Sequence, residues 1–126
     1  MENHLYEYAV VRYVPRVERE EFINVGLIMM CKRKRWIRVE FVVNADRLCS
    51  FDNAITIDDL QRQLMSFTRI CSGDRLGGPM ASMEVEERFR WLTAVRSACV
   101  QTSRPHPGKT PDLDITFMRL LHELVE

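Results

Sequence analysis

The sequence predicts an α+β fold, in which an antiparallel sheet of about four strands carries about three helices packed mainly on one face. Two observations support this prediction. The first half of the chain is rich in β-branched and aromatic residues with a period of two, which is typical of strands. The second half places apolar residues at helical spacing. Strands followed by helices, rather than alternating with them, indicate an α+β domain.

Three strands are expected in the first half, at residues 4–15, 22–31 and 36–43. The first is apolar on both faces at Ala9–Val11, which indicates a central strand. In the second strand every odd position is apolar, and in the third apolar and polar residues alternate. Because the links between them are short, we expect an antiparallel meander with one solvated face.

Three helices and a short fourth strand are expected in the second half. Thr56 is the predicted cap of the first helix, which ends at Gly73, while Ser82 and Thr110 are the predicted caps of the other two. The fourth strand is expected within residues 98–103. The predicted apolar faces of the three helices are Leu60, Leu64, Phe67 and Cys71, then Val85, Phe89 and Leu92, and finally Leu113, Phe117, Leu120, Leu121 and Leu124.

Length and composition narrow the class of protein. The 126 residues suit a single domain spanning 1–126. Basic and acidic residues number 18 each, so the net charge is zero, which argues against a strongly basic nucleic-acid binder. No apolar run is long enough for a membrane span, and no signal peptide is visible. Four scattered cysteines fit buried thiols in a reducing cytoplasm, and we expect no metal and no cofactor.

One stretch has the last three letters of a phosphate-binding loop, at Gly108-Lys109-Thr110. That motif also needs a glycine five residues before Gly108, where this chain has Ser103. Pro105 and Pro107 have no N–H group to point at a phosphate. The sequence therefore argues against a nucleotide site here.

A polar set of residues interrupts the predicted strands. Arg12 lies on the first strand, Asn24 breaks the apolar second strand, and Gln101 lies on the fourth. If they share one face of the sheet, they would form a polar patch suited to an anion or a peptide. Alternatively, Asn24 completes a buried structural network. Arg12 would then lie in solvent at the strand end or pair with Glu20 or Glu21 across the loop. His106 is a candidate acid–base group, provided that it has a partner and a pocket.

A basic turn follows the second predicted strand. It comprises Lys32, Arg33, Lys34 and Arg35, with Arg38 two residues beyond Trp36. Such a patch could contact nucleic acid, and Trp36 could stack on a base. The alternative is a solvated hairpin tip whose charge discourages aggregation between sheet edges.

Two long blocks, residues 6–31 and 73–108, resemble the signature blocks of a bacterial family called domain of unknown function 3037. Val95 and Lys109 depart from the family pattern. The resemblance implies no established activity and assigns no catalytic residue. Because members of that family are often encoded beside HipA-like kinase-type proteins, the resemblance implies an adaptor or regulatory partner. The residues that match the family pattern are Arg12, Tyr13, Pro15, Asn24, Gly26, Arg88, Phe89, Trp91, Arg96, Ser97, Gln101, Ser103, His106 and Gly108.

Three functions follow as hypotheses. The first is a non-enzymatic protein-interaction or adaptor module with a protein partner, kinase-like by the resemblance. The second is nucleic-acid binding through the basic turn at 32–38. The third is an enzyme whose polar site comprises Arg12, Asn24, Arg96, Gln101 and His106. The sequence does not set the oligomeric state.

Overall fold

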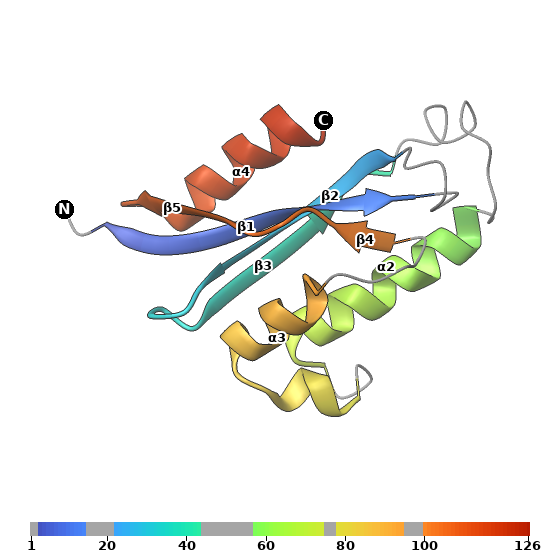
Figure 1. The fold of residues 1–126 in the computed structure, drawn as a ribbon, viewed down its shortest axis with the longest axis horizontal. Helices are drawn as coiled ribbons and strands as arrows, with labels where there is room; N and C mark the ends of the chain where they lie inside the picture. The colour runs from blue at the N-terminus through green and yellow to red at the C-terminus, as the bar shows by residue number, and fades with distance from the viewer. Residues whose placement is uncertain (1–2, 15–21, 44–56, 75–77, 95–99) are drawn as a thin grey trace.

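A five-stranded antiparallel sheet lies between two layers of helices in the computed structural model, which describes residues 3–14, 22–43, 57–74, 78–94 and 100–126. Helices α2 (Ile57–Ser72) and α3 (Val85–Leu92) cover one face, and α4 (Leu113–Leu124) lies on the other (Figure 1). The α+β prediction is confirmed, with two of the three helices on one face. The expectation of a solvated face was wrong, because α4 packs against it.

The central strand is β1, which pairs along both of its edges. On one edge it pairs with β2, which in turn pairs with β3; on the other edge it pairs with β4 and β5. The predicted central position of the first strand and the predicted meander are therefore confirmed. The strands are β1 (His4–Tyr13), β2 (Ile23–Cys31), β3 (Trp36–Phe41), β4 (Val100–Thr102) and β5 (His106–Thr110).

Strands β4 and β5 share one edge of β1, and buried Ser103 lies between them. The Ser103 N–H donates to the Val10 carbonyl (2.8 Å), and the Val10 N–H donates to Ser103 Oγ (2.9 Å). The serine hydroxyl thus takes the place of a ladder carbonyl where the strand is interrupted. Strand β5 was not predicted from the sequence, because prolines such as Pro107 suggest a loop. Since β5 is an edge strand, the missing N–H of a proline is tolerated there.

The three-letter phosphate motif lies on this edge strand. Residues 106–110 pair with β1 from Tyr8 back to His4, so Gly108 and its neighbours are extended rather than wrapped around an anion. Gly108 lies opposite Tyr6, whose hydroxyl would be 2.4 Å from a Cβ at that position. The glycine is therefore needed for the Tyr6 ring to cross the strand.

A β-bulge changes the side-chain alternation of β2. Val11 lies opposite Gly26 but Arg12 lies opposite Asn24, so Val25 is the extra residue. Ile23 and Val25 consequently pack against α2 and α3, whereas Leu27 and Met29 pack against α4. The apolar odd positions of this strand therefore divide between the two faces of the sheet.

Each face of the sheet has its own hydrophobic core. The larger core joins the sheet to α2 and α3, and the smaller one joins it to α4. The predicted apolar faces of all three helices lie in these cores, which is confirmed by their burial and packing. The larger core includes Ala9, Val11, Ile28, Met30, Leu60, Leu64, Phe67, Val85, Phe89 and Leu92, and the smaller includes Tyr6, Val10, Leu27, Met29, Phe117, Leu120 and Leu121.

Two of the predicted helix caps were wrong. The Ser82 hydroxyl bonds to the Pro79 carbonyl within a short 3-10 helix, η3 (Pro79–Ser82), and α3 begins after Glu84 without a side-chain cap. Thr110, the predicted cap of α4, belongs to β5. The cap is instead Asp112, whose carboxylate accepts a hydrogen bond from the Ile115 N–H. The end of α2 before Gly73, which has φ +78°, is confirmed. Thr56 lies outside the described residues.

Replacing Gly26 tests the close approach between β2 and β3. A Cβ at this position would lie 2.4 Å from Phe41 Cδ1 and 2.8 Å from the Glu40 carbonyl oxygen. We expect Gly26→Ala to lower the free energy of unfolding in urea by about 1–3 kcal/mol, as overpacking does. The cost should fall when Phe41 is replaced by Leu, because part of the clash is removed. Strictly additive effects of the two substitutions would contradict this contact.

Candidate functional site

Polar side chains from three neighbouring strands lie in one row across the sheet. Arg12 on β1 lies opposite Asn24 on β2 and opposite Gln101 on β4. We call these three residues the polar row. The bulge at Val25 places Asn24 in this position, since without the extra residue a different side chain would face Arg12. The structure thus brings together three of the five residues predicted for a polar site.

Asn24 joins the polar row to the end of α4. Its Nδ2 donates a 2.9 Å hydrogen bond to the Leu124 carbonyl, one of the carbonyls left without a helical partner at a C-terminus. Its Oδ1 is buried and has no hydrogen-bond partner among the described residues. The amide therefore has a structural function, which was one of the two readings that the sequence left open.

Arg12 contacts an aromatic ring, whereas Glu20 and Glu21, the acidic partners suggested by the sequence, lie outside the described residues. Its guanidinium carbon lies 4.2 Å above the centre of the Phe22 ring, a cation–π contact. It makes no ion pair with any residue in the described ranges, and its Nε is buried without a hydrogen-bond partner there. The polar row therefore presents a positive charge that the described part of the chain leaves uncompensated.

His106 lies apart from the polar row. It is opposite Tyr8 on β1, with the ring centres 5.3 Å apart, and its side chain is exposed. Tyr8 is four residues from Arg12, a distance of about 13 Å along an extended strand. His106 therefore cannot reach Arg12 by a hydrogen bond. Arg96, the fifth predicted residue, lies outside the described residues.

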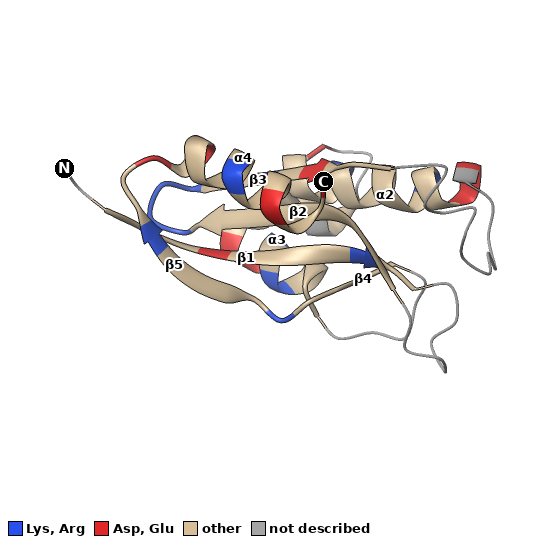
Figure 2. Ribbon diagram, turned by 90° about the horizontal axis from the view of Figure 1, so that it is seen from above, with Lys and Arg blue, Asp and Glu red and all other residues tan. Residues whose placement is uncertain are grey.

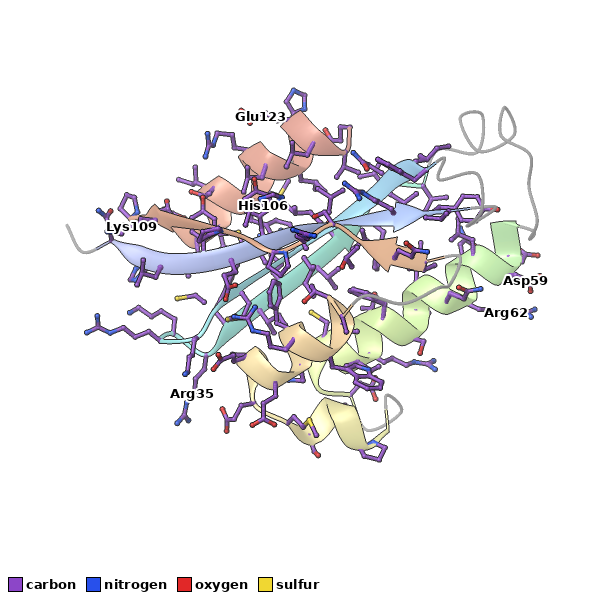
Figure 3. The ribbon with its side chains drawn as sticks, viewed as in Figure 1. Arg35, Asp59, Arg62, His106, Lys109 and Glu123 are labelled. Carbon is purple, nitrogen blue, oxygen red and sulfur yellow. The ribbon has the colours of Figure 1, made fainter. Side chains whose placement is uncertain are left out.

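The basic turn between β2 and β3 is a continuous basic stretch (Figure 2), but its first lysine is engaged with an acid. Lys32 Nζ lies 2.9 Å from a Glu86 carboxylate oxygen on α3. This hydrogen bond raises the pKa of Lys32 and lowers the pKa of Glu86. Arg33, Lys34 and Arg35 are exposed; Figure 3 shows Arg35 at the turn, away from His106 on β5.

The two predicted residues beyond the turn pack against α4. Arg38 lies 2.9 Å from Asp114 and 3.2 Å from Glu40, and its guanidinium lies over the Phe117 ring. Trp36 is half-buried and meets Phe117 edge-on, with ring centres 6.4 Å apart. These side chains hold β3 to α4, so Trp36 is not a free stacking platform for a base.

Helix α3 has an exposed surface that the sequence did not predict. A shallow groove of about 650 Å³ is lined by Met83, Glu86, Glu87, Arg90, Trp91 and Ala94, which we call the α3 surface. Trp91 is 45% exposed and Met83 is 38% exposed. The available signal was a tryptophan that lies off the predicted apolar stripe of this helix.

Charges on the α3 surface divide into paired and unpaired groups. Arg90 Nη1 donates to a Glu7 carboxylate oxygen at 2.9 Å, and Glu86 pairs with Lys32 as described above. Glu84 and Glu87 make no ion pair with any residue of the described segments. The described segments therefore leave the charges of these two carboxylates without an ion pair.

The described thiols are not nucleophiles. Cys31 and Cys71 are both buried free cysteines, and burial raises the pKa of Cys71 to about 12. The described residues also contain no group of three or more His, Cys, Asp or Glu side chains placed to hold a metal ion. Within the same part of the chain, no helix has the length and apolar character to cross a membrane.

Titration of Glu86 tests the ion pair between the turn and α3. Because its folded pKa is lowered, the stabilisation that it contributes is present above the unfolded pKa and is lost as the pH falls through the folded pKa. In Lys32→Met we expect the carboxyl resonance of Glu86 to titrate at higher pH by NMR. The matched variant Lys34→Met, on the same turn, should leave it unchanged. Equal titration in both variants would show that Lys32 does not set this pKa.

Comparison with known proteins supports the resemblance noted in the sequence. A family model described as protein of unknown function (DUF3037) matches residues 8–125, nearly the whole chain. No curated protein and no solved structure gives a significant match. The match includes the strand that carries Arg12, the bulge with Asn24, the helix that carries Trp91 and the edge strand with His106. The chain therefore belongs to the DUF3037 family of proteins of unknown function.

Proposed function

We propose that this protein is a non-enzymatic interaction module that binds a partner protein through the α3 surface. The observation that supports the proposal is the exposure of Trp91 beside Met83 over a shallow groove. Tryptophan is enriched among the residues that dominate binding energy in protein interfaces. An exposed apolar patch rimmed by polar residues is typical of protein–protein interaction sites.

The scaffold beneath the surface supports a preformed site. Phe89 is fully buried in the core, and Arg88 Nη1 donates a 2.8 Å hydrogen bond to the Cys71 carbonyl at the end of α2. The ion pairs of Glu86 with Lys32 and of Arg90 with Glu7 tie α3 to the hairpin and to β1. A surface held in this way loses little conformational entropy on binding.

Charge indicates the chemistry of the partner. Glu87 lines the groove and Glu84 follows Met83 in the sequence, and neither carboxylate makes an ion pair within the described segments. The partner segment that complements this surface is apolar with basic residues on either side. The family resemblance suggests that the partner is a HipA-like kinase-type protein encoded beside the gene, for which this chain would be an adaptor.

The other two hypotheses receive less support from the geometry. Lys32 and Arg38 pair with acids and Trp36 packs on Phe117, which leaves a small basic footprint for nucleic acid. The enzyme hypothesis loses the convergence of His106 with Arg12 that acid–base catalysis would need.

Co-expression with the neighbouring HipA-like protein tests the proposal. We expect a stoichiometric complex on co-purification, and Trp91→Ala should weaken it by at least about thirtyfold, the effect of losing an interface hot spot. The matched control is Met65→Ala, since Met65 is also an exposed large apolar residue, 53% exposed, but lies on α2. Calorimetric titration of the purified proteins gives both affinities.

Two outcomes would contradict the proposal. One is recovery of the chain alone at micromolar concentrations when both proteins are folded and present. The other is an equal loss of affinity in Trp91→Ala and Met65→Ala, which would place the interface elsewhere. Because Trp91 is half exposed, we expect its replacement to keep Tm close to that of the unchanged chain, so a folding defect can be recognised separately.

A further inference from the structure

A second concave site lies on the opposite side of α3 from its exposed surface. It is a cavity of about 190 Å³ bounded by α2, the end of α3 and strand β4. A cavity of about 150 Å³ in another protein holds a benzene molecule, so this volume suits a ligand of about one six-membered ring. The cavity belongs to neither the polar row nor the basic turn, apart from Gln101 at its border.

The inner wall of the cavity is apolar. Phe67 and Leu92 are buried, and Ile70 and Val100 are partly buried and pack against the larger core. These side chains come from α2, α3 and β4, so their positions are set by the packing of the sheet against both helices. The apolar wall favours a ligand with a compact hydrophobic body.

The rim of the cavity is polar, with no charged side chain among the described lining residues. Gln63 and Ser66 line it from α2, and Gln101 and Thr102 line it from β4. No charged residue lines it within the described segments. The lining that the structure describes therefore offers no ion pair to a charged ligand, and it favours an uncharged molecule with hydrogen-bonding groups.

Thr102 supplies a hydroxyl that makes no hydrogen bond within the described residues. Its Cα lies opposite Val11, whose side chain belongs to the larger core, so the Thr102 side chain lies on the same face as the cavity. Thr102 Oγ1 is buried and has no hydrogen-bond partner within the described ranges. Rotation about χ1 can therefore turn the hydroxyl toward a ligand without breaking an existing bond. A hydroxyl can both donate and accept, so it suits a ligand hydroxyl, carbonyl or amide.

We propose that this cavity is a binding site for a small uncharged molecule of about one ring, which the Thr102 hydroxyl recognises by a hydrogen bond. The inference is independent of the partner surface, since it concerns the isolated chain. Three features of the described lining favour such a ligand: the apolar wall binds its hydrophobic body, the rim offers no charge, and the Thr102 hydroxyl offers a hydrogen bond.

Phenol, toluene and benzoate are probes that separate these features. By methyl NMR of the full chain, phenol and toluene should shift the resonances of Ile70, Leu92 and Val100 saturably at millimolar concentrations, whereas benzoate should not. Thr102→Val, which keeps the shape and removes the hydroxyl, should weaken phenol about fivefold and leave toluene unchanged.

A cavity-filling variant controls for binding elsewhere. Ser66 is exposed at the rim, so Ser66→Phe should close the cavity and abolish the shifts while Tm is retained. Gln61→Phe is the matched control, because Gln61 is exposed on the same helix and does not line the cavity. The proposal would be overturned by the absence of saturable binding of both uncharged probes. Equal binding of benzoate, unchanged binding in Ser66→Phe or unchanged phenol affinity in Thr102→Val would also overturn it.

Discussion

Strand β1 is paired along both edges and covered on both faces, and the other elements are arranged to satisfy its backbone. Its N–H and C=O groups bond to β2 on one side and to β4 and β5 on the other. Where that second edge is interrupted, Ser103 supplies its hydroxyl as the acceptor for the Val10 N–H. A buried backbone donor without a partner would cost about 1–3 kcal/mol, so the serine maintains pairing at the break between the two short strands. This pairing holds the last helix, which follows β5 directly, against the sheet.

The bulge in β2 connects this framework to the candidate site. One extra residue, Val25, reverses the alternation of the strand, so that apolar side chains supply a core on each face. The same reversal puts Asn24 beside Arg12 and within reach of the Leu124 carbonyl. Gly26 follows at the point where the Phe41 ring crosses the strand, because no Cβ fits there. The polar row is therefore a consequence of the bulge that supplies apolar side chains to both cores. The Asn24 amide of this row joins β2 to the end of α4.

Function in this chain is better sought on surfaces than in an acid–base site. Two charged groups of the hairpin bind neighbouring helices, in the contacts of Lys32 with Glu86 and of Arg38 with Asp114. Such exposed pairs contribute little stability individually, but together they define the orientation of α3 and α4 relative to the hairpin. Helix α3 also carries an exposed tryptophan beside acidic residues, and its end borders a cavity with no charged residue among the described lining. Ala94 borders both, at the end of α3.

The local pattern of the sequence was sufficient for the element types, the fold class and the family. Periodicity identifies the three long strands and the buried faces of all three helices, because side-chain burial follows the geometry of each element. It could not reveal β5, since proline argues against a strand until the strand is known to lie at an edge. It also could not place the bulge at Val25, which is visible only from the pairing with β1. Arg12, Asn24 and Gln101 could be selected as polar interruptions, but their alignment depends on register. The exposure of Trp91 and the cavity beside Thr102 were decided by tertiary packing alone, because both depend on which neighbours cover a side chain and which do not.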